Sequence, residues 1–151
     1  MPLSAGSLYD FLREVERALE RPVTLVAAGG TALTLLKVKE STLDVDFTGP
    51  KDDVKAFRAA LGRTPHGFKV DLWPDGQVFS QFLPEDYLTR SRQIRRFGRI
   101  SLKALHPVDI VVTKAGRLDA RDEEDIRDCI RHFGLKKHDI AARAKQVEYV
   151  G

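Results

Sequence analysis

Hydrophobic positions recur at helical spacing near the start of the chain. Leu8, Leu12 and Val15 would lie on one face of a helix, with charged residues on the other face. Ser7 is placed to cap the first turn of this helix. The pattern therefore predicts an amphipathic helix over residues 7–20.

Other segments alternate between apolar and polar residues, which indicates strands with one buried face. In residues 42–47, Leu43 and Val45 would lie on one face, and Asp44 and Asp46 on the other. Further strands are predicted at residues 23–28, 68–73 and 99–105.

Helices are predicted between and after these strands, at residues 31–38, 50–62, 107–114, 119–134 and 136–150. This order predicts an α/β (α+β) protein with a mixed β-sheet of about four or five strands flanked by helices. A helical C-terminal tail would occupy about residues 107–151. A chain of 151 residues without repeats or a linker favours one domain over residues 1–151.

Composition narrows the class of protein. The chain is 42% hydrophobic and 31% charged, which is typical of a folded globular protein. Its 25 Lys and Arg exceed its 22 Asp and Glu only slightly, so net charge alone does not indicate a nucleic-acid partner. The single Cys129 excludes an internal disulfide. Without a signal peptide or a membrane-length apolar run, we expect a cytoplasmic protein with no membrane partner.

Two carboxylates on one strand face are the first candidate for chemistry. Asp44 and Asp46 would repel each other unless they are solvated or neutralised by a cation. Asp71 lies in the middle of a later predicted strand, and three such carboxylates could hold one or two Mg²⁺ ions. The alternatives are a solvated strand face and, for Asp71, a surface pair with Lys69.

A pair of glycines stands between the first predicted strand and the next helix. Gly29 and Gly30 could hold a phosphate at backbone N–H groups, with the Thr31 hydroxyl beside them. By themselves the two glycines equally suit a tight turn from strand to helix.

These motifs together resemble the polymerase-β-like nucleotidyltransferase superfamily. The resemblance rests on Gly29-Gly30-Thr31, on Ser41-Thr42-Leu43-Asp44-Val45-Asp46 and on Asp71. More narrowly, the chain is similar to small nucleotidyltransferase-like proteins related to AbiEii-type toxins. That similarity rests on Val108-Asp109-Ile110-Val111-Val112-Thr113-Lys114, Arg117 and Arg121-Asp122-Glu123-Glu124-Asp125-Ile126.

The resemblance implies a nucleotidyltransferase fold and a role for each matching residue. Asp44 and Asp46 would bind Mg²⁺ or Mn²⁺, and Asp71 would help to activate the acceptor hydroxyl. The triphosphate would be held by Gly29, Gly30 and Thr31, and its charge would be neutralised by Lys114. Many superfamily members have Gly-Ser in place of Gly29-Gly30. Lys114 could equally extend its stem along the core, and helical ion pairs would equally explain Arg121, Asp122 and Asp125.

A basic stretch follows the third predicted strand. It contains Arg90, Arg92, Arg95, Arg96, Arg99 and Lys103, with no acidic residue among them. Such a stretch suits the phosphates of a nucleic acid, and it equally suits a charged edge strand that resists aggregation.

The sequence therefore predicts an Mg²⁺-dependent enzyme that transfers a nucleoside monophosphate from an NTP to a hydroxyl of RNA, such as tRNA, or of a protein. The resemblance implies a toxin that is paired with an antitoxin protein. One alternative is an inactive module of this fold that binds nucleic acid or a protein partner. Another is transfer to an aminoglycoside-like hydroxyl.

Overall fold

The chain folds around one mixed sheet, and its computed structural model describes residues 2–117 and 119–150. The elements in chain order are α1 (Ala5–Glu16), β1 (Val23–Ala27), α2 (Gly29–Leu35), β2 (Val45–Gly49), α3 (Lys51–Leu61), β3 (Val70–Pro74), β4 (Gln77–Val78), β5 (Gln81–Phe82), α4 (Tyr87–Arg90), β6 (Arg92–Phe97), β7 (Ile100–Ala104), α5 (Pro107–Arg117), α6 (Asp122–Phe133), α7 (Lys137–Ala144) and β8 (Glu148–Tyr149). The predicted fold class, a mixed sheet flanked by helices, is confirmed.

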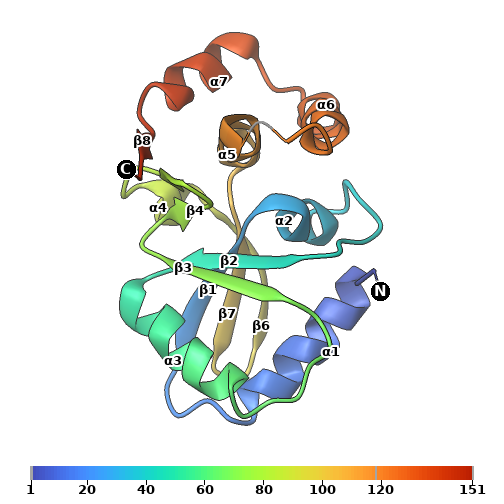
Figure 1. Cartoon of the computed structure of the whole chain (residues 1–151), viewed down its shortest axis with the longest axis vertical. Coiled ribbons are helices and arrows are strands. Elements are labelled where there is room, and N and C mark those ends of the chain that lie inside the picture. The colour runs from blue at the N-terminus through green and yellow to red at the C-terminus, as the bar shows by residue number, and fades with distance from the viewer. Residues whose placement is uncertain (1, 118, 151) are drawn as a thin grey trace.

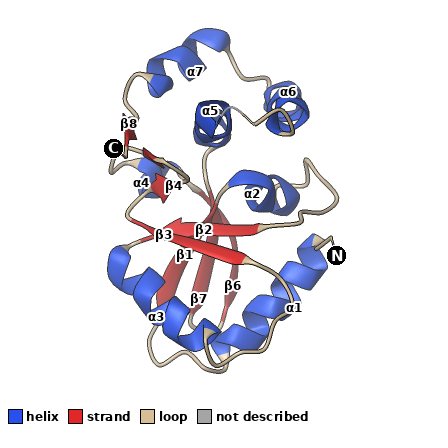
Figure 2. Ribbon diagram, in the orientation of Figure 1, coloured by secondary structure: helices blue, strands red, loops and turns tan. Residues whose placement is uncertain are grey.

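Five strands form the main sheet in the order β3-β2-β1-β7-β6. Strand β1 runs parallel to β7 and antiparallel to β2, β2 runs parallel to β3, and β6 runs antiparallel to β7. A small second sheet has the order β4-β5-β8, so the end of the chain returns to the segment that follows β3 (Figure 2).

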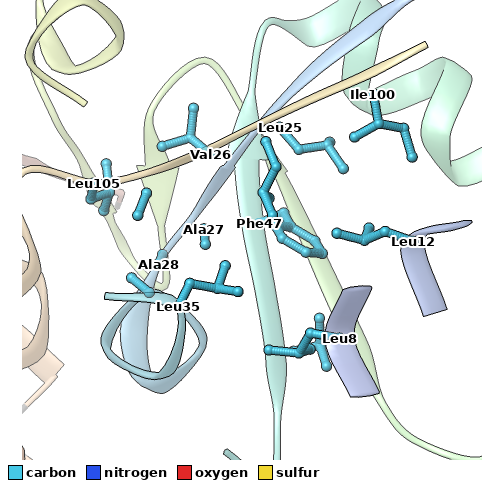
Figure 3. Close-up of a cluster of buried hydrophobic side chains, with 14 of the residues drawn as sticks. Leu8, Leu12, Leu25, Val26, Ala27, Ala28, Leu35, Phe47, Ile100 and Leu105 are labelled. Carbon is cyan, nitrogen blue, oxygen red and sulfur yellow. The ribbon is translucent and has the colours of Figure 1, made fainter. Parts of the chain in front are cut away.

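Helices lie on both sides of the main sheet. Figure 1 shows α1 and α3 on one side, and α2 with the C-terminal helices α5 to α7 on the other. The core between the sheet and α1 includes Leu8, Leu12, Leu25 and Phe47, all fully buried (Figure 3). Burial of such side chains contributes roughly 1.5–3 kcal/mol each, so this packing fixes the position of β2.

The strand that carries the two aspartates starts later than predicted. It begins at Val45, and Leu43, which was expected on the buried face, is 63% exposed. The reason is a backbone bridge in which Thr42 exchanges hydrogen bonds with Leu3. Thr42 thus pairs with the N-terminal segment, and pairing with β3 begins at Val45.

Both ends of the chain also differ from the prediction. The first helix is capped by the Ser4 hydroxyl, which accepts a hydrogen bond from the Ser7 backbone N–H at 3.2 Å, so Ser7 lies inside the helix. The last predicted helix ends at Ala144, and β8 follows it. For the basic stretch, a charged edge strand was one of two interpretations of the sequence, and β6 is a strand at the edge of the main sheet.

No helix in the described part of the chain is long and apolar enough to cross a membrane.

Candidate active site

A surface pocket lies between the start of β2 and the helices α2, α5 and α6. Its lining includes Gly30, Asp44, Asp46, Lys114 and Asp122. It therefore joins side chains from the sheet to side chains from the C-terminal helices, which are far apart in the sequence.

Hydrogen bonds from two threonines position the segment that carries Asp44 and Asp46. The Thr31 hydroxyl donates to the Asp44 carbonyl oxygen at 3.0 Å and accepts from the Asp46 backbone N–H at 3.0 Å. The Thr42 hydroxyl donates to the same Asp44 carbonyl at 2.8 Å. These bonds fix the direction of the backbone on both sides of Val45, and both aspartates line the pocket.

The two glycines leave room for these polar groups. Gly29 has a φ of 55°, in the left-handed region that favours glycine, and an added Cβ would lie 3.0 Å from Oδ2 of Asp46. At Gly30 an added Cβ would lie 2.8 Å from Oγ1 of Thr42 and 3.7 Å from Nζ of Lys39. Side chains at these positions would therefore crowd the carboxylate and the pocket.

Asp46 has the most perturbed carboxyl group of the site. It is 4% exposed, and burial, followed by the nearby charges of Asp71 and Asp44, raises its pKa from 3.8 to about 7. Asp44, by contrast, is exposed. Neither aspartate has a Lys, Arg or His nitrogen within 4.0 Å among the residues that the structure describes.

Asp71 lies beside Asp46 on the neighbouring strand. The two residues are register partners in the parallel pair of β2 and β3, so their side chains extend from the same face of the sheet. Asp71 does not line the pocket, and Nζ of Lys69 lies 3.7 Å from its Oδ2. Within residues 2–117 and 119–150, no three His, Cys, Asp or Glu side chains form a ready metal site.

The opposite wall of the pocket is a network of ion pairs. Lys114 is 3% exposed, and its Nζ lies 2.7 Å from Oδ1 of Asp122 and 3.1 Å from Oδ2 of Asp125. Arg117 donates two hydrogen bonds to Asp122, at 2.9 and 3.0 Å. Nζ of Lys39 also reaches Oδ2 of Asp125, at 3.1 Å. Three cations and two carboxylates therefore make this wall positive.

The pKa of Asp122 is shifted in the opposite direction to the pKa of Asp46. Burial acts to raise its pKa, but hydrogen bonds from Lys114 and Arg117 outweigh burial and hold the pKa below its usual value. Asp122 is therefore an anion that keeps two cations in place.

An aromatic residue lies between the two walls. Phe79 lines the pocket, and the guanidinium carbon of Arg117 is 4.2 Å from the centre of its ring. Trp73 also packs against Phe79, edge to face, with the ring centres 5.3 Å apart. Phe79 has a φ of 56°, an uncommon conformation for a bulky side chain. The turn after β4 thus holds the ring beside the aspartates.

The structure brings together most of the residues that the sequence singled out. Asp44, Asp46, Gly30 and Lys114 line one pocket. The hydroxyl of Thr31, for which a phosphate contact is predicted, is fully buried here and bonded to the backbone of the aspartate segment. Lys114 is held by two carboxylates, which sequence spacing could not show.

Helical ion pairs among Arg121, Asp122 and Asp125, one alternative from the sequence, are not what the structure shows. Arg121 pairs with Asp119, with Nη2 and Oδ2 2.8 Å apart, and the two aspartates face Lys114. Asp122 and Asp125 are three residues apart on α6, so both lie on the face of this helix that contacts α5.

The basic stretch separates into two groups. Arg90, Arg99 and Lys103 reach neighbouring structure: Arg90 lies 3.5 Å from Asp109, Arg99 donates to the Leu19 carbonyl at 2.7 Å, and Lys103 donates to the Leu88 carbonyl at 3.1 Å. The other group is exposed along the edge strand β6 and contains Arg92, Arg95 and Arg96. The basic stretch of the sequence therefore does not form one continuous basic surface in the structure.

Sequence reasoning missed Lys39 and Phe79. Lys39 follows α2 in a polar segment, Lys37-Val38-Lys39-Glu40, and nothing in that pattern indicates that α6 lies opposite. Phe79 could not be predicted as a pocket residue, because a single aromatic residue in a turn-rich segment can just as well belong to the hydrophobic core.

Comparison with known proteins agrees with this fold and identifies the class of protein as a nucleotidyltransferase. Residues 7–132 match the model of a family described as "Nucleotidyltransferase of unknown function" (DUF6036), and the chain belongs to this family. No curated protein sequence matches the chain. A similar solved structure is the crystal structure of ANT(2")-Ia in complex with adenylyl-2"-tobramycin. The two chains are 16% identical with a TM-score of 0.56, and the likeness covers 91% of this chain and 92% of the other. At this identity the likeness shows a shared fold.

Proposed function

We propose that this nucleotidyltransferase transfers a nucleoside monophosphate from an NTP to a hydroxyl group of RNA, with pyrophosphate as the second product, and that the reaction depends on Mg²⁺ or Mn²⁺. The observation that carries the proposal is one pocket with carboxylates on one wall and cationic side chains on the opposite wall. Asp44 and Asp46 face it without a cationic partner among the described residues, and Lys39, Lys114 and Arg117 face it from the other side.

The carboxylates suit a hard divalent cation. Their oxygen atoms are the ligands that Mg²⁺ prefers. Burial and the charges of Asp71 and Asp44 raise the pKa of Asp46, and the charges of Arg117 and Lys114 lower it by less. Asp44 and Asp46 would hold the metal, with Asp71 beside them. When bound, the metal would supply charge neutralisation at the phosphates and would lower the pKa of the attacking hydroxyl.

The other residues bind and orient the nucleotide. Gly30 lines the pocket without a side chain that would crowd Thr42 and Lys39, and Lys39 and Lys114 offset the negative charge of the triphosphate. Asp122 and Asp125 keep the two lysines at fixed positions, so little reorganisation is needed when the nucleotide binds.

The exposed arginines of β6 favour RNA as the acceptor, because each phosphate contact adds salt-dependent affinity. Transfer to an aminoglycoside-like hydroxyl is the second candidate, since the similar structure of ANT(2")-Ia holds an adenylylated tobramycin. The resemblance to AbiEii-type proteins further suggests a toxin that an antitoxin neutralises.

The test is incubation of the purified protein with each α-labelled NTP and Mg²⁺, with either total RNA or tobramycin as the acceptor. We expect label in RNA that is lost in Asp44→Asn and Asp46→Asn, by more than about a hundredfold, because each change removes a direct metal ligand. Asp52→Asn, which changes an exposed carboxylate on α3, is the matched control.

The outcomes separate the candidates. Label in tobramycin but not in RNA would replace the RNA proposal with the second candidate. Nucleotide binding without any transferred label would indicate a binding module of this fold. Label that persists in both aspartate variants would contradict the metal site itself.

A further inference from the structure

A second set of charged groups lies along α1 and β6. A groove between these elements is lined by Arg13 and Arg17 from the helix and by Arg95 and Arg96 from the strand. All four arginines are exposed. No local pattern joins Arg13 and Arg17 to the later basic stretch, because about eighty positions separate them.

Two aromatic rings hold part of this cluster in place. The guanidinium carbon of Arg95 lies 5.3 Å from the ring centre of Tyr9 and 5.5 Å from that of Phe97. The guanidinium carbon of Arg13 lies 5.2 Å from the Phe97 ring. Guanidinium groups that rest on rings lose little further side-chain freedom on binding, and their N–H groups remain available for paired hydrogen bonds to phosphate.

Few negative charges compete for these arginines. Arg95 and Arg96 have no carboxylate oxygen within 4.0 Å among residues 2–117 and 119–150. Arg13 pairs with Asp10 at 3.0 Å and Arg17 with Glu14 at 3.6 Å, but both are exposed pairs within one helix, which are weak and exchangeable. Glu16 also lines the groove, next to Gly98. The groove therefore keeps a positive excess.

Helix α1 connects this groove to the candidate active site. Pro2, just before the helix, lines the active-site pocket, and Arg13 lies eight residues after the helix begins at Ala5. At 1.5 Å per residue, Arg13 lies about 12 Å along the helix axis from Ala5, and the residues before Ala5 add to its separation from the pocket. In Figure 1 the N-terminal end of α1 lies beside the segment that joins α2 to β2, and the helix runs away from that segment.

We propose that the groove of Arg13, Arg17, Arg95 and Arg96 binds the phosphate backbone of the RNA acceptor, while the acceptor hydroxyl reaches the pocket at the start of α1. The inference rests on the proposed function, since it assigns the surface that holds the acceptor. A chain of phosphates matches both the charge of the groove and its separation from the pocket. An acidic protein would match the charge alone.

The test is binding of a short fluorescein-labelled single-stranded RNA, without NTP, to the full-length protein at several salt concentrations. We expect Arg95→Glu combined with Arg96→Glu to weaken binding by about tenfold or more and to lower the salt slope by about 1.4, since each single-strand phosphate contact contributes about 0.7. Arg127→Glu combined with Arg131→Glu on α6 makes the same change in net charge and should leave binding within about twofold. Arg96→Glu alone, at an exposed position, covers the case in which the double variant does not fold.

Several results would contradict the proposal that this groove binds RNA. These are equal weakening by the α6 control, binding that does not respond to salt, and competition by polyglutamate as effective as that by unlabelled RNA. The last result would identify an acidic polypeptide as the partner. Asp46→Asn separates this inference from the proposed function, because it should lose transfer of label and still bind RNA. RNA binding that depends on Arg95 and Arg96 would support the groove even if no transfer is detected.

Discussion

Asp46 and Asp122 are buried aspartates on opposite walls of one pocket, yet their environments shift their pKa values in opposite directions. Burial, followed by the charges of Asp71 and Asp44, raises the pKa of Asp46 to about 7. Asp122 has Lys114 and Arg117 within hydrogen-bond distance, and its pKa falls. Residue type and burial are therefore insufficient to assign a role to a carboxylate.

The difference separates a carboxylate that holds a protein cation from one that is available to an external cation. On the helical wall the protein supplies its own counterions, and the network is complete. On the sheet wall no Lys, Arg or His nitrogen of the described residues lies within 4.0 Å of Asp44 or Asp46, and the charges of Arg117 and Lys114 only partly oppose the raised pKa of Asp46. Identical substitutions on the two walls should therefore have opposite consequences for stability.

The largest expected effect is on the helical wall. Asp122→Asn removes the anion that holds Lys114 and Arg117, so a buried ammonium loses one of its two partners. We expect the free energy of unfolding to fall by about 3 kcal/mol, as is typical when one member of a buried pair is removed. Urea denaturation at neutral pH measures this change. Asp46→Asn is the matched variant, and a comparable loss of stability in it would contradict the contrast between the walls.

A smaller effect should appear as a pH dependence that belongs to the sheet wall. Because the pKa of Asp46 is raised in the folded state, folding favours its protonated form. The stabilisation is complete below about pH 4 and is lost as the pH rises toward 7. Between pH 5 and pH 7 this amounts to about 2 kcal/mol, at 1.36 kcal/mol for each pKa unit.

Denaturation curves at both pH values, without divalent metal, measure this loss in the unmodified protein and in Asp46→Asn. The variant should lose correspondingly less stability over the same interval, since its amide does not titrate. Added Mg²⁺ should recover stability at pH 7 in the unmodified protein and not in the variant. Equal pH dependence in the two proteins would show that another group is responsible.

The sequence was sufficient for the fold and for one wall of the site. Alternating and helical patterns gave the class of fold, and the glycines with Asp44 and Asp46 located the pocket because these residues are close in sequence. The helical wall required packing: Lys39 meets Asp125 across 86 positions, and no local pattern encodes that contact. The start of β2 was also misplaced, because the Leu3–Thr42 bridge is a long-range pairing.

The smallest expected effect concerns Thr31, which links the glycine turn to the aspartate segment. Its hydroxyl bridges the Asp44 carbonyl and the Asp46 N–H, so Thr31→Val would leave two buried backbone groups without this partner. We expect a loss of about 1–2 kcal/mol in unfolding free energy, together with weaker Mg²⁺ dependence of transfer, whereas Thr31→Ser keeps the hydroxyl and should restore both. If Thr31 instead contacted the triphosphate, the valine variant would raise KM for NTP and leave the Mg²⁺ dependence unchanged. Transfer measured against Mg²⁺ and against NTP in both variants therefore decides whether this hydroxyl positions the carboxylates or binds the nucleotide.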